Sequence, residues 1–382
     1  MLFSEILGQE HIKAHLTKSA DAGRIPHAQL FIGAEGSGTL PMAIAYAQYI
    51  LCGNTSAENT TGNAACNIKF DHLAHPDLHF VFPVSTNSEV KSHPVSNHFS
   101  KQWREFVSES PYGSLFDWYK KIDIQNKQGQ IGVDEAQEIM KALSLKAYEG
   151  GYKIMIIWMA DRMNTATSNK LLKLLEEPPE KTVFLLIAES EDDLLQTILS
   201  RCQVLHFGGL SEKVITNALV SKSYADPRTA AKIAHQAQGN YNKALHLLYN
   251  DDDGLPFEEW FVQWVRAAFR AKGNAAAIHD LITWSESIAG IGREAQKQFL
   301  LFCIDMFRQA LLLNYNAKEL VFIEPTVEKF TLENFAPFVN GNNINDIFKE
   351  LSDALYHIER NGNAKIILTD LSIKLTRLIH KK

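Results

Sequence analysis

The sequence lacks the features of secreted, membrane-spanning and disulfide-stapled proteins. No apolar run reaches the roughly 18 residues that a membrane-spanning helix needs. Near the N-terminus, Glu5 and Glu10 stand where a signal peptide has basic and then apolar residues. Only four cysteines occur, and they are scattered: Cys52, Cys66, Cys202 and Cys303. We therefore expect a cytoplasmic chain that needs no disulfide framework and has no membrane segment.

An excess of basic residues is also missing. The chain has 38 Lys and Arg against 44 Asp and Glu, a formal charge of −6. This balance argues against tight, sequence-independent wrapping of nucleic acid by the whole surface, although it is compatible with a local basic patch. With 46% hydrophobic and 21% charged residues, the composition is that of a folded globular protein. A length of 382 residues indicates two or three domains.

A third absence lies inside a motif. The segment GAEGSGTL, residues 33–40, has the glycines of a P-loop, which reads G-x-x-x-x-G-K-[ST], but Thr39 replaces the lysine that pairs with the phosphates. Leu40 cannot offer a hydroxyl to Mg²⁺. Gly33, Gly36 and Gly38 still allow backbone N–H groups to approach a phosphate. Three interpretations of this degenerate nucleotide site stay open: a plain turn that needs glycine, residual phosphate binding, and catalysis.

Predicted strands and helices alternate around this loop, which is typical of a parallel sheet covered on both faces. The pattern predicts strands over 28–33, 153–158, 182–188 and 203–207, and helices over 9–22, 41–51, 131–147 and 164–177. Polar, turn-rich sequence near 82–130 is interpreted as an insertion. After Gly208 and Gly209 only helices are predicted, three short ones and then a C-terminal part rich in Trp, Phe and Leu.

Several phrases occur in the order that one known family has. They are ILGQE (6–10), RIPHAQLFIGAEGSG (24–38), HPDLHFV (75–81), YKIMIIWMADRMN (152–164), SNKLLKLLEEPP (168–179) and LLQTILSRCQ (194–203). In these phrases the chain resembles bacterial clamp-loader subunits, most closely the delta-prime subunits of DNA polymerase III. The resemblance implies an AAA+ type α/β P-loop domain over 1–207, a small helical lid domain over 208–254 and an all-α collar domain over 255–382.

The resemblance also implies a function. Such a subunit joins ATPase (gamma/tau) and delta subunits, and the complex loads the sliding clamp onto primer-template DNA; a monomer in isolation is compatible with this. An active ATPase would carry an acidic pair where this chain has Trp158 and Met159, and only Asp161 remains of the expected acidic cluster. We therefore expect no bound cofactor and no hydrolysis by the chain alone. The rival interpretations are an autonomous AAA+ ATP-binding or ATP-hydrolysing enzyme with an unusual P-loop, and a free DNA-binding module, which the net charge disfavours.

The SRC motif, Ser200-Arg201-Cys202, carries the most specific expectation. In the family its arginine reaches the γ-phosphate held by a neighbouring ATPase subunit, as an arginine finger in trans. A guanidinium suits this role because its charge is permanent and its donors are forked. The alternative is a surface arginine that caps the end of a helix, where a cation is favoured. Ser200 and Cys202 are expected to serve packing and the turn.

Metal binding is not expected. Relatives carry a cysteine-rich zinc knuckle in the first third of the chain, whereas this sequence has Cys52 and Cys66 with His72, His75 and His79 nearby but no C-x-x-C.

Three further parts of the sequence allow a structural interpretation. The segment GNYNKAL, 239–245, resembles the family's sensor-2 segment, but Asn242 and Lys243 stand near the position of its arginine. Glu176 and Glu177 are interpreted as the polar end of a helix. The C-terminal aromatic clusters are expected to be mostly core, with some surface left for neighbouring subunits.

Overall fold

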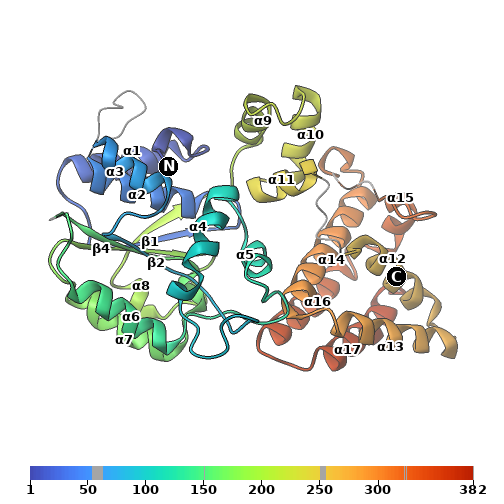
Figure 1. Cartoon of the computed structure of the whole chain (residues 1–382). Coiled ribbons are helices and arrows are strands. Elements are labelled where there is room, and N and C mark those ends of the chain that lie inside the picture. Colours follow the sequence, from blue (N-terminus) through green and yellow to red (C-terminus); the bar gives the residue numbers. More distant parts are fainter. Residues whose placement is uncertain (54–62, 150, 250–254, 322, 324, 382) are drawn as a thin grey trace. The chain divides into compact units, whose positions relative to one another are not determined.

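The computed structural model of the chain describes residues 1–53, 63–149, 151–249, 255–321, 323 and 325–381. The chain forms two compact units (Figure 1). The first comprises Met1–Ile124 and Gly129–Asn250, and the second comprises Gln125–Gln128 and Asp251–Lys382. The predicted boundary between the lid and collar domains, at residue 254, lies outside the described residues.

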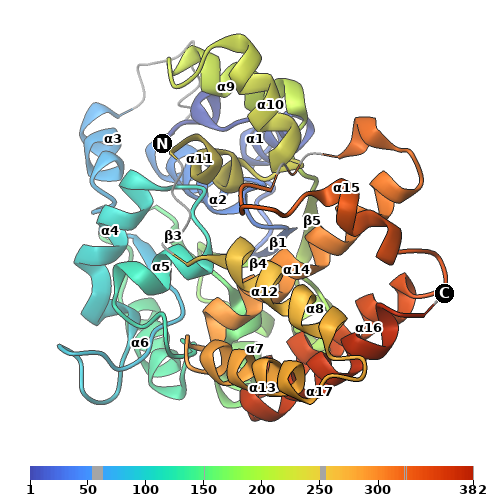
Figure 2. The ribbon, with the colours of Figure 1, turned by 90° about the vertical axis from the view of Figure 1, so that its right-hand side faces the viewer.

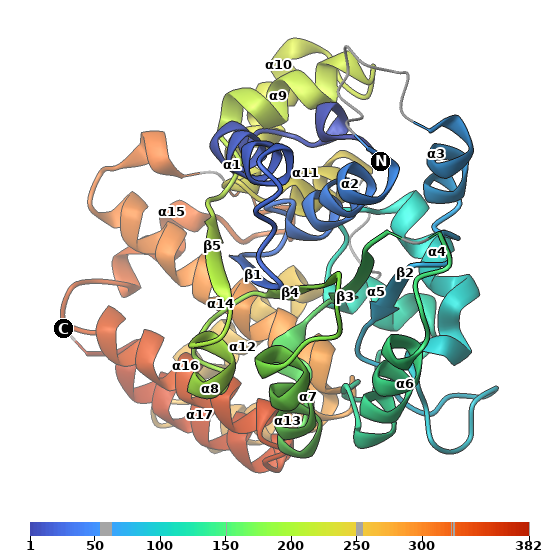
Figure 3. The same cartoon turned by 90° about the vertical axis from the view of Figure 1, so that its left-hand side faces the viewer.

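A five-stranded parallel sheet forms the centre of the first unit (Figure 3). Its order is β2-β3-β4-β1-β5, and its strands are β1 (Ala28–Gly33), β2 (Leu78–Val81), β3 (Lys153–Ile157), β4 (Thr182–Ala188) and β5 (Gln203–Phe207). Every residue of β1, β3 and β4 is buried, as expected of central strands covered on both faces. The predicted fold class, a parallel α/β sheet followed by helical domains, is confirmed.

The sheet has a separate core on each face, because successive residues of a strand point to opposite sides. In β3, Ile154 and Ile156 join one core and Met155 and Ile157 join the other. The first core also receives residues of α1 (Glu10–Asp21), α2 (Thr39–Cys52), α3 (Ala64–Asp71), α4 (Ser100–Glu109) and α5 (Leu115–Lys121). The second receives residues of α6 (Val133–Ser144), α7 (Thr165–Glu176) and α8 (Gln196–Leu199).

Local chemistry explains where two of these helices begin. The Asn164 side chain accepts a hydrogen bond from the Thr167 N–H at 2.8 Å, so α7 starts one residue after its cap and close to the predicted position. Helix α6 is shorter than the predicted 131–147. Ile131 forms an isolated parallel bridge with Met163, which requires extended backbone there, and the helix begins only after Gly132.

The predicted insertion is more regular than its turn-rich sequence indicates. It contains α4, α5 and a short 3-10 helix over Ser96–Phe99. Trp103 on α4 stacks on Phe82, with ring centroids 4.1 Å apart. On α5, Trp118 Nε1 donates a hydrogen bond to the Pro83 carbonyl at 2.8 Å. The insertion is therefore part of the core on one face of the sheet.

Three short helices follow the sheet within the first unit: α9 (Glu212–Ser221), α10 (Pro227–Ala237) and α11 (Tyr241–Tyr249). Asp226 caps α10 by accepting hydrogen bonds from the N–H groups of Arg228 and Thr229, and Pro227 occupies its first turn. These helices share an apolar cluster that also contains Tyr112 of the insertion.

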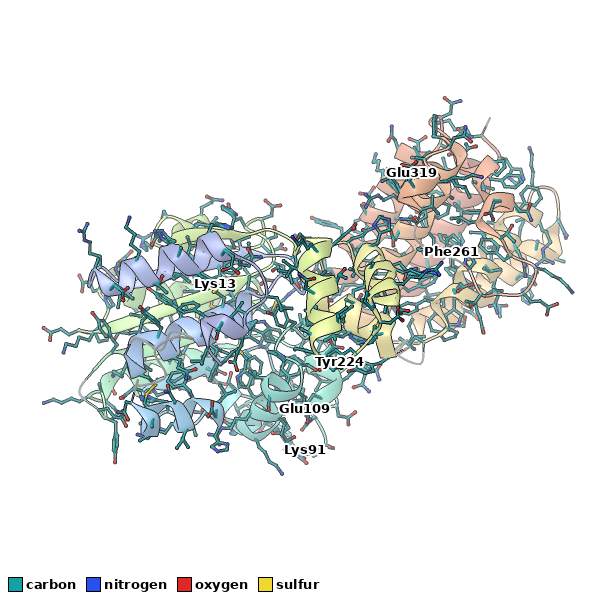
Figure 4. All side chains as sticks on the ribbon, turned by 90° about the horizontal axis from the view of Figure 1, so that it is seen from above. Lys13, Lys91, Glu109, Tyr224, Phe261 and Glu319 are labelled. Atoms are coloured by element: carbon teal, nitrogen blue, oxygen red, sulfur yellow. A yellow bond between two sulfur atoms is a disulfide. The ribbon has the colours of Figure 1, made fainter. Side chains whose placement is uncertain are left out.

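The second unit is entirely helical in its described residues (Figure 2). Its helices are α12 (Phe257–Arg270), α13 (Ala275–Ala289), α14 (Arg293–Asn314), α15 (Leu332–Phe335), α16 (Ile344–Glu359) and α17 (Ala364–Leu378). Trp264 stacks on Trp284 with centroids 5.0 Å apart and donates through Nε1 to Ser372 Oγ at 2.9 Å. Phe261 lies fully buried among the side chains of these helices (Figure 4). The expectation that the aromatic clusters are mostly core is confirmed.

The cysteines differ from the sequence-based expectation. Cys52 and Cys66 form a disulfide that joins the end of α2 to α3. The small number of scattered cysteines had led us to expect no disulfide framework. Cys202 and Cys303 are free. Among the described helices, none combines the length and apolar character needed to cross a bilayer.

Candidate functional site

The GAEGSGTL loop connects β1 to α2, as the sequence predicts. Gly36 and Gly38 adopt φ of 71° and 93°, in the left-handed region that favours glycine. At Gly36 a side chain would also collide, because its Cβ would lie 2.0 Å from Asn240 Oδ1. The glycines are therefore needed for the turn and for the close approach of α11's first residues.

Apolar side chains occupy two positions where a working P-loop enzyme has a hydroxyl group and an acid. Leu40 is 3% exposed and belongs to the core. Trp158, directly after β3, is 2% exposed and packs on Trp103 and Phe106, with ring centroids 5.2 and 5.8 Å away. These aromatic neighbours would disfavour the charged form of the metal-binding acid that an ATPase would place there.

The space beside the loop is almost filled by protein. A cavity of about 20 Å³ remains between the loop, Trp158, Ile187 and two residues of the insertion, Pro111 and Tyr112. That volume holds about one water molecule, whereas ligand sites generally measure about 300–1,000 Å³. The Tyr112 ring lies against Gly38, 3.1 Å from where a Cβ would be, and its hydroxyl accepts a hydrogen bond from the Leu7 N–H at 2.8 Å.

The segment GNYNKAL, 239–245, closes the loop from the other side. Asn240 and Asn242 both donate to Glu35 Oε1, at 3.1 and 3.3 Å. The Tyr241 N–H donates to the Gly36 carbonyl at 3.3 Å, and the Tyr241 ring packs edge-on against Tyr112, with centroids 5.0 Å apart. The two asparagines thus bind a side chain of the loop itself, and we call this set of contacts, from Glu35 to Asn240 and Asn242, the lid clasp.

Asp117 on α5 extends the lid clasp into the insertion. Its Oδ2 accepts hydrogen bonds from Asn242 Nδ2 at 2.8 Å and from the N–H and Oγ of Ser114 at 2.8 and 2.7 Å. Its Oδ1 lies 3.3 Å from His246 Nε2. Burial alone would disfavour the charged form, but hydrogen bonds from His246 and Ser114 outweigh it and lower the pKa of Asp117 to about 2. Glu35 behaves oppositely, because burial raises its pKa.

The depressed pKa of Asp117 predicts a specific acid sensitivity. Because the folded pKa lies below the ordinary 3.8, the carboxylate stabilises the folded unit above about pH 4 and loses this contribution as the pH falls towards 2. The loss amounts to about 2 kcal/mol. Urea unfolding between pH 5 and pH 2 should therefore show a steeper decline for the wild type than for Asp117→Asn. Parallel declines would contradict the assignment, and Asp123→Asn, at an exposed position, serves as the control.

Arg201 lies between α8 and β5, at the surface of the first unit. Its Nη1 donates to the Thr197 carbonyl at 2.7 Å and to Ser200 Oγ at 3.3 Å, and its Nη2 pairs with the Glu176 carboxylate. The side chain keeps 32% of its surface exposed. Arg201 therefore both caps α8, as the alternative interpretation predicts, and presents a partly open guanidinium.

The residues flanking Arg201 have structural contacts. Ser200 Oγ donates to the Thr197 carbonyl at 3.2 Å, within the turn that follows α8. Cys202 packs half-buried against the second core, and burial raises the pKa of its thiol to about 11. A protonated thiol is a poor nucleophile, so these contacts favour the packing and turn roles expected of both residues.

One group of possible metal ligands occurs in the described residues. Donor atoms of Cys66, His75 and Glu149 all lie within 4.8 Å of one another. The Cys66 sulfur is bonded to Cys52, and the Glu149 carboxylate pairs with Lys69 and with His75 Nε2. A disulfide sulfur is not the thiolate that zinc binds, so this arrangement does not fit a zinc site. His72 is exposed, and His79 lines a different cavity.

Sequence reasoning missed several of the residues that close the loop. Glu35 was a variable position of the motif, and Tyr112 and Asp117 lay in the insertion. One signal was present, since Ser114 and Asp117 have the spacing of a capping box, which marks the start of a helix. Glu176 was interpreted only as a polar helix end, and its pairing with Arg201 had no signal in the sequence.

Comparison with known proteins gives a consistent result. Residues 8–211 match the family model described as "DNA polymerase III, delta subunit". The chain is 29% identical over 244 residues to DNA polymerase III subunit delta' of Bacillus subtilis. The matched region covers 64% of this chain and 60% of that protein. The Haemophilus influenzae subunit delta' is 39% identical over 107 residues, 28% of this chain and 32% of that protein. The chain thus matches less than two thirds of the length of either relative.

More distant similarity extends to other subunits. The gamma/tau subunit of Mycobacterium tuberculosis is 27% identical over 199 residues, 52% of this chain and 27% of that protein. Among solved structures, a gamma-subunit-related protein of Thermotoga maritima aligns over 97% of this chain and 99% of that chain, with 13% identity and a TM-score of 0.40.

Proposed function

The chain belongs to the DNA polymerase III delta-prime subunit family, and from this premise we propose that it is the non-hydrolysing subunit of a bacterial clamp loader. In this role it assembles with ATPase subunits that load the sliding clamp onto primed DNA. It binds no ATP of its own and supplies Arg201 to the ATP site of a neighbour. A cytoplasmic location follows from this role.

The observation that carries the proposal is the closed P-loop. The loop has lost its lysine, the adjoining cavity measures about 20 Å³, and the lid clasp holds the sensor-2 segment against it. Each feature disfavours binding of a triphosphate, and together they disfavour the rival interpretation of an autonomous ATPase. The lid is instead held by contacts between protein side chains.

The geometry of Arg201 supports a role in trans. A guanidinium has five N–H donors, and the contacts with Thr197, Ser200 and Glu176 use only some of them. The pair with Glu176 is partly exposed, and such pairs contribute only about 0–1 kcal/mol. A neighbour's triphosphate carries more charge than one carboxylate, so it would displace Glu176 from the guanidinium at little cost.

The proposed partners are gamma/tau and delta subunits, with the clamp and the primer-template DNA reached through the complex. The second unit offers apolar surface for such contacts. Ile278 and Ile282 on α13 are 47% and 37% exposed, and Ile366 and Ile373 on the adjacent α17 are 67% and 46% exposed. Apolar side chains of this size that are left open on neighbouring helices favour a contact with another subunit.

Restoring the two missing P-loop residues should not restore nucleotide binding. In Thr39→Lys with Leu40→Thr the charge and the hydroxyl return, but Tyr112, Trp158 and the lid clasp still fill the site. Titration with Mg·ATP should show no saturable binding up to about 1 mM. This limit corresponds to a binding free energy weaker than about −4 kcal/mol. Circular dichroism checks that the double variant is folded, and an ATPase subunit is the positive control. Micromolar affinity in the double variant or in the wild-type chain would contradict the proposal.

A further inference from the structure

Strand β2 ends the sheet on one side (Figure 3). The residues that line a groove include those of β2, α4 and α6. This groove encloses a cavity of about 230 Å³. One wall comes from α4, which belongs to the core on one face of the sheet, and the other from α6, which belongs to the core on the opposite face. The groove shares no lining residue with the cavity beside the P-loop, so it is a separate feature of the first unit.

Backbone groups of β2 that bond to no described residue face this groove. The carbonyls of Asp77 and Val81 accept hydrogen bonds from the N–H groups of Ile154 and Trp158, at 2.9 and 2.8 Å. Odd-numbered residues of β2 therefore bond to β3, and the N–H and C=O of Phe80 point the other way. No described strand pairs with this edge. An edge of this kind is a ready template for another extended chain.

A side chain closes the edge at one end only. Ser96 Oγ accepts a hydrogen bond from the Phe82 N–H at 3.0 Å and donates to the Phe82 carbonyl at 3.2 Å, as a neighbouring strand would. At the other end the Leu78 N–H donates to the His75 carbonyl at 3.1 Å. The open stretch is thus short, from the Leu78 carbonyl to the Phe80 carbonyl, and lies along the cavity.

A buried carboxylate lines the same groove. Glu135 is 2% exposed, and its Oε2 accepts a hydrogen bond from the Ser96 N–H at 2.7 Å. Glu138, one turn further along α6, also lines the cavity. Burial raises the pKa of Glu135 to about 7. A cation placed beside this carboxyl would lower its pKa again, because it favours the charged form.

Among the titratable groups that line the groove, none places a positive charge beside Glu135, whereas Glu138 pairs with Lys141 at 3.9 Å. Burial lowers the pKa of His79, so its imidazole is neutral at pH 7. Arg104 on α4 lines the groove but is exposed to solvent. The interior of the groove therefore favours a positive group next to Glu135.

We propose that this groove binds an extended segment of a partner protein, which adds as a strand to the edge of β2 and places a lysine or arginine side chain against Glu135. Backbone hydrogen bonds to Phe80 supply affinity, and the carboxylate selects the basic residue. A cavity of about 230 Å³ suits one such side chain better than a drug-sized ligand. The site is independent of Arg201 and of the P-loop.

The test uses a fluorescein-labelled, end-blocked heptapeptide, Val-Thr-Val-Lys-Val-Thr-Val, and fluorescence anisotropy with the full chain. Three changes separate the contributions: norleucine for lysine, N-methylation of alternate backbone amides, and Glu135→Gln in the protein. Each should weaken binding at least about tenfold, because each removes a charge-assisted or backbone hydrogen bond. Glu109→Gln, an exposed carboxylate at the end of α4, is the matched control and should leave binding unchanged.

Several results would overturn the proposal. One is the absence of saturable binding by the lysine peptide. The others are a norleucine peptide or an N-methylated peptide that binds as tightly as the lysine peptide. Full competition by butylamine at the peptide's own concentration would mean that the groove accepts only a small cation. If Glu135→Gln did not fold, the two modified peptides would still decide the question on the wild-type protein.

Discussion

Arg201→Ala should lower hydrolysis at the neighbouring ATP site roughly 10³-fold while leaving assembly intact. An arginine that stabilises transition-state charge on a γ-phosphate is worth about 10³–10⁵ in rate in GTPases. The measurement needs a reconstituted clamp loader in which only the neighbouring ATPase subunit keeps its P-loop lysine, so that turnover at other sites does not mask the loss. Hydrolysis is then followed with primer-template DNA present.

Two further variants make the result specific. Arg201→Lys keeps the charge but loses the forked donors, and it should recover only a small part of the rate. Arg228→Ala removes an exposed arginine at the start of α10 and should behave as the wild type. If the Arg201→Ala complex assembled and hydrolysed ATP at the normal rate, Arg201 would be only the cap of α8. The closed P-loop would be unaffected by that outcome.

Asn242→Ala should destabilise the first unit by about 3 kcal/mol. The Asn242 side chain is 5% exposed and donates to two carboxylates, Glu35 and Asp117. Its removal takes one charge-assisted hydrogen bond from each of these half-buried carboxylates, and a hydrogen bond to a charged group contributes about 1.5–3 kcal/mol. Urea unfolding measures the loss. Hydrogen exchange should show faster opening of α11, because the lid clasp no longer holds it.

The matched control is Asn217→Ala on α9 of the same lid. Asn217 is exposed, so its loss should change stability by less than about 0.5 kcal/mol. If Asn242→Ala unfolded like the control, the lid would be held by its apolar cluster rather than by the lid clasp. Unchanged exchange in α11 would lead to the same conclusion.

The sequence predicted the elements that local patterns encode. Buried strands such as 153–158 and 182–188 were apparent from apolar runs, and the P-loop followed from the spacing of its glycines. The degenerate character of the site was also apparent, because Thr39 and Leu40 replace residues with a defined role.

What the sequence did not predict is how the site is closed. Glu35 and Asn240 are 205 positions apart, and a contact of that range has no local pattern. The helices of the insertion were missed for another reason. Trp103, Phe106 and Val107 do have helical spacing, but the polar residues before them dominated the interpretation. The Cys52–Cys66 disulfide was unexpected because two scattered cysteines give no indication of pairing.

Trp158 would make the proposed absence of catalysis hard to reverse. Replacing it with aspartate would place a carboxylate against Trp103 and Phe106, leave a cavity, and bury a charge without a partner. The protein carrying this single substitution would be less stable and would still lack ATPase activity. A working ATPase site would therefore require several neighbouring substitutions at once, since their effects on stability are coupled. The packing of side chains around Trp158 therefore opposes a gain of ATPase activity through single substitutions.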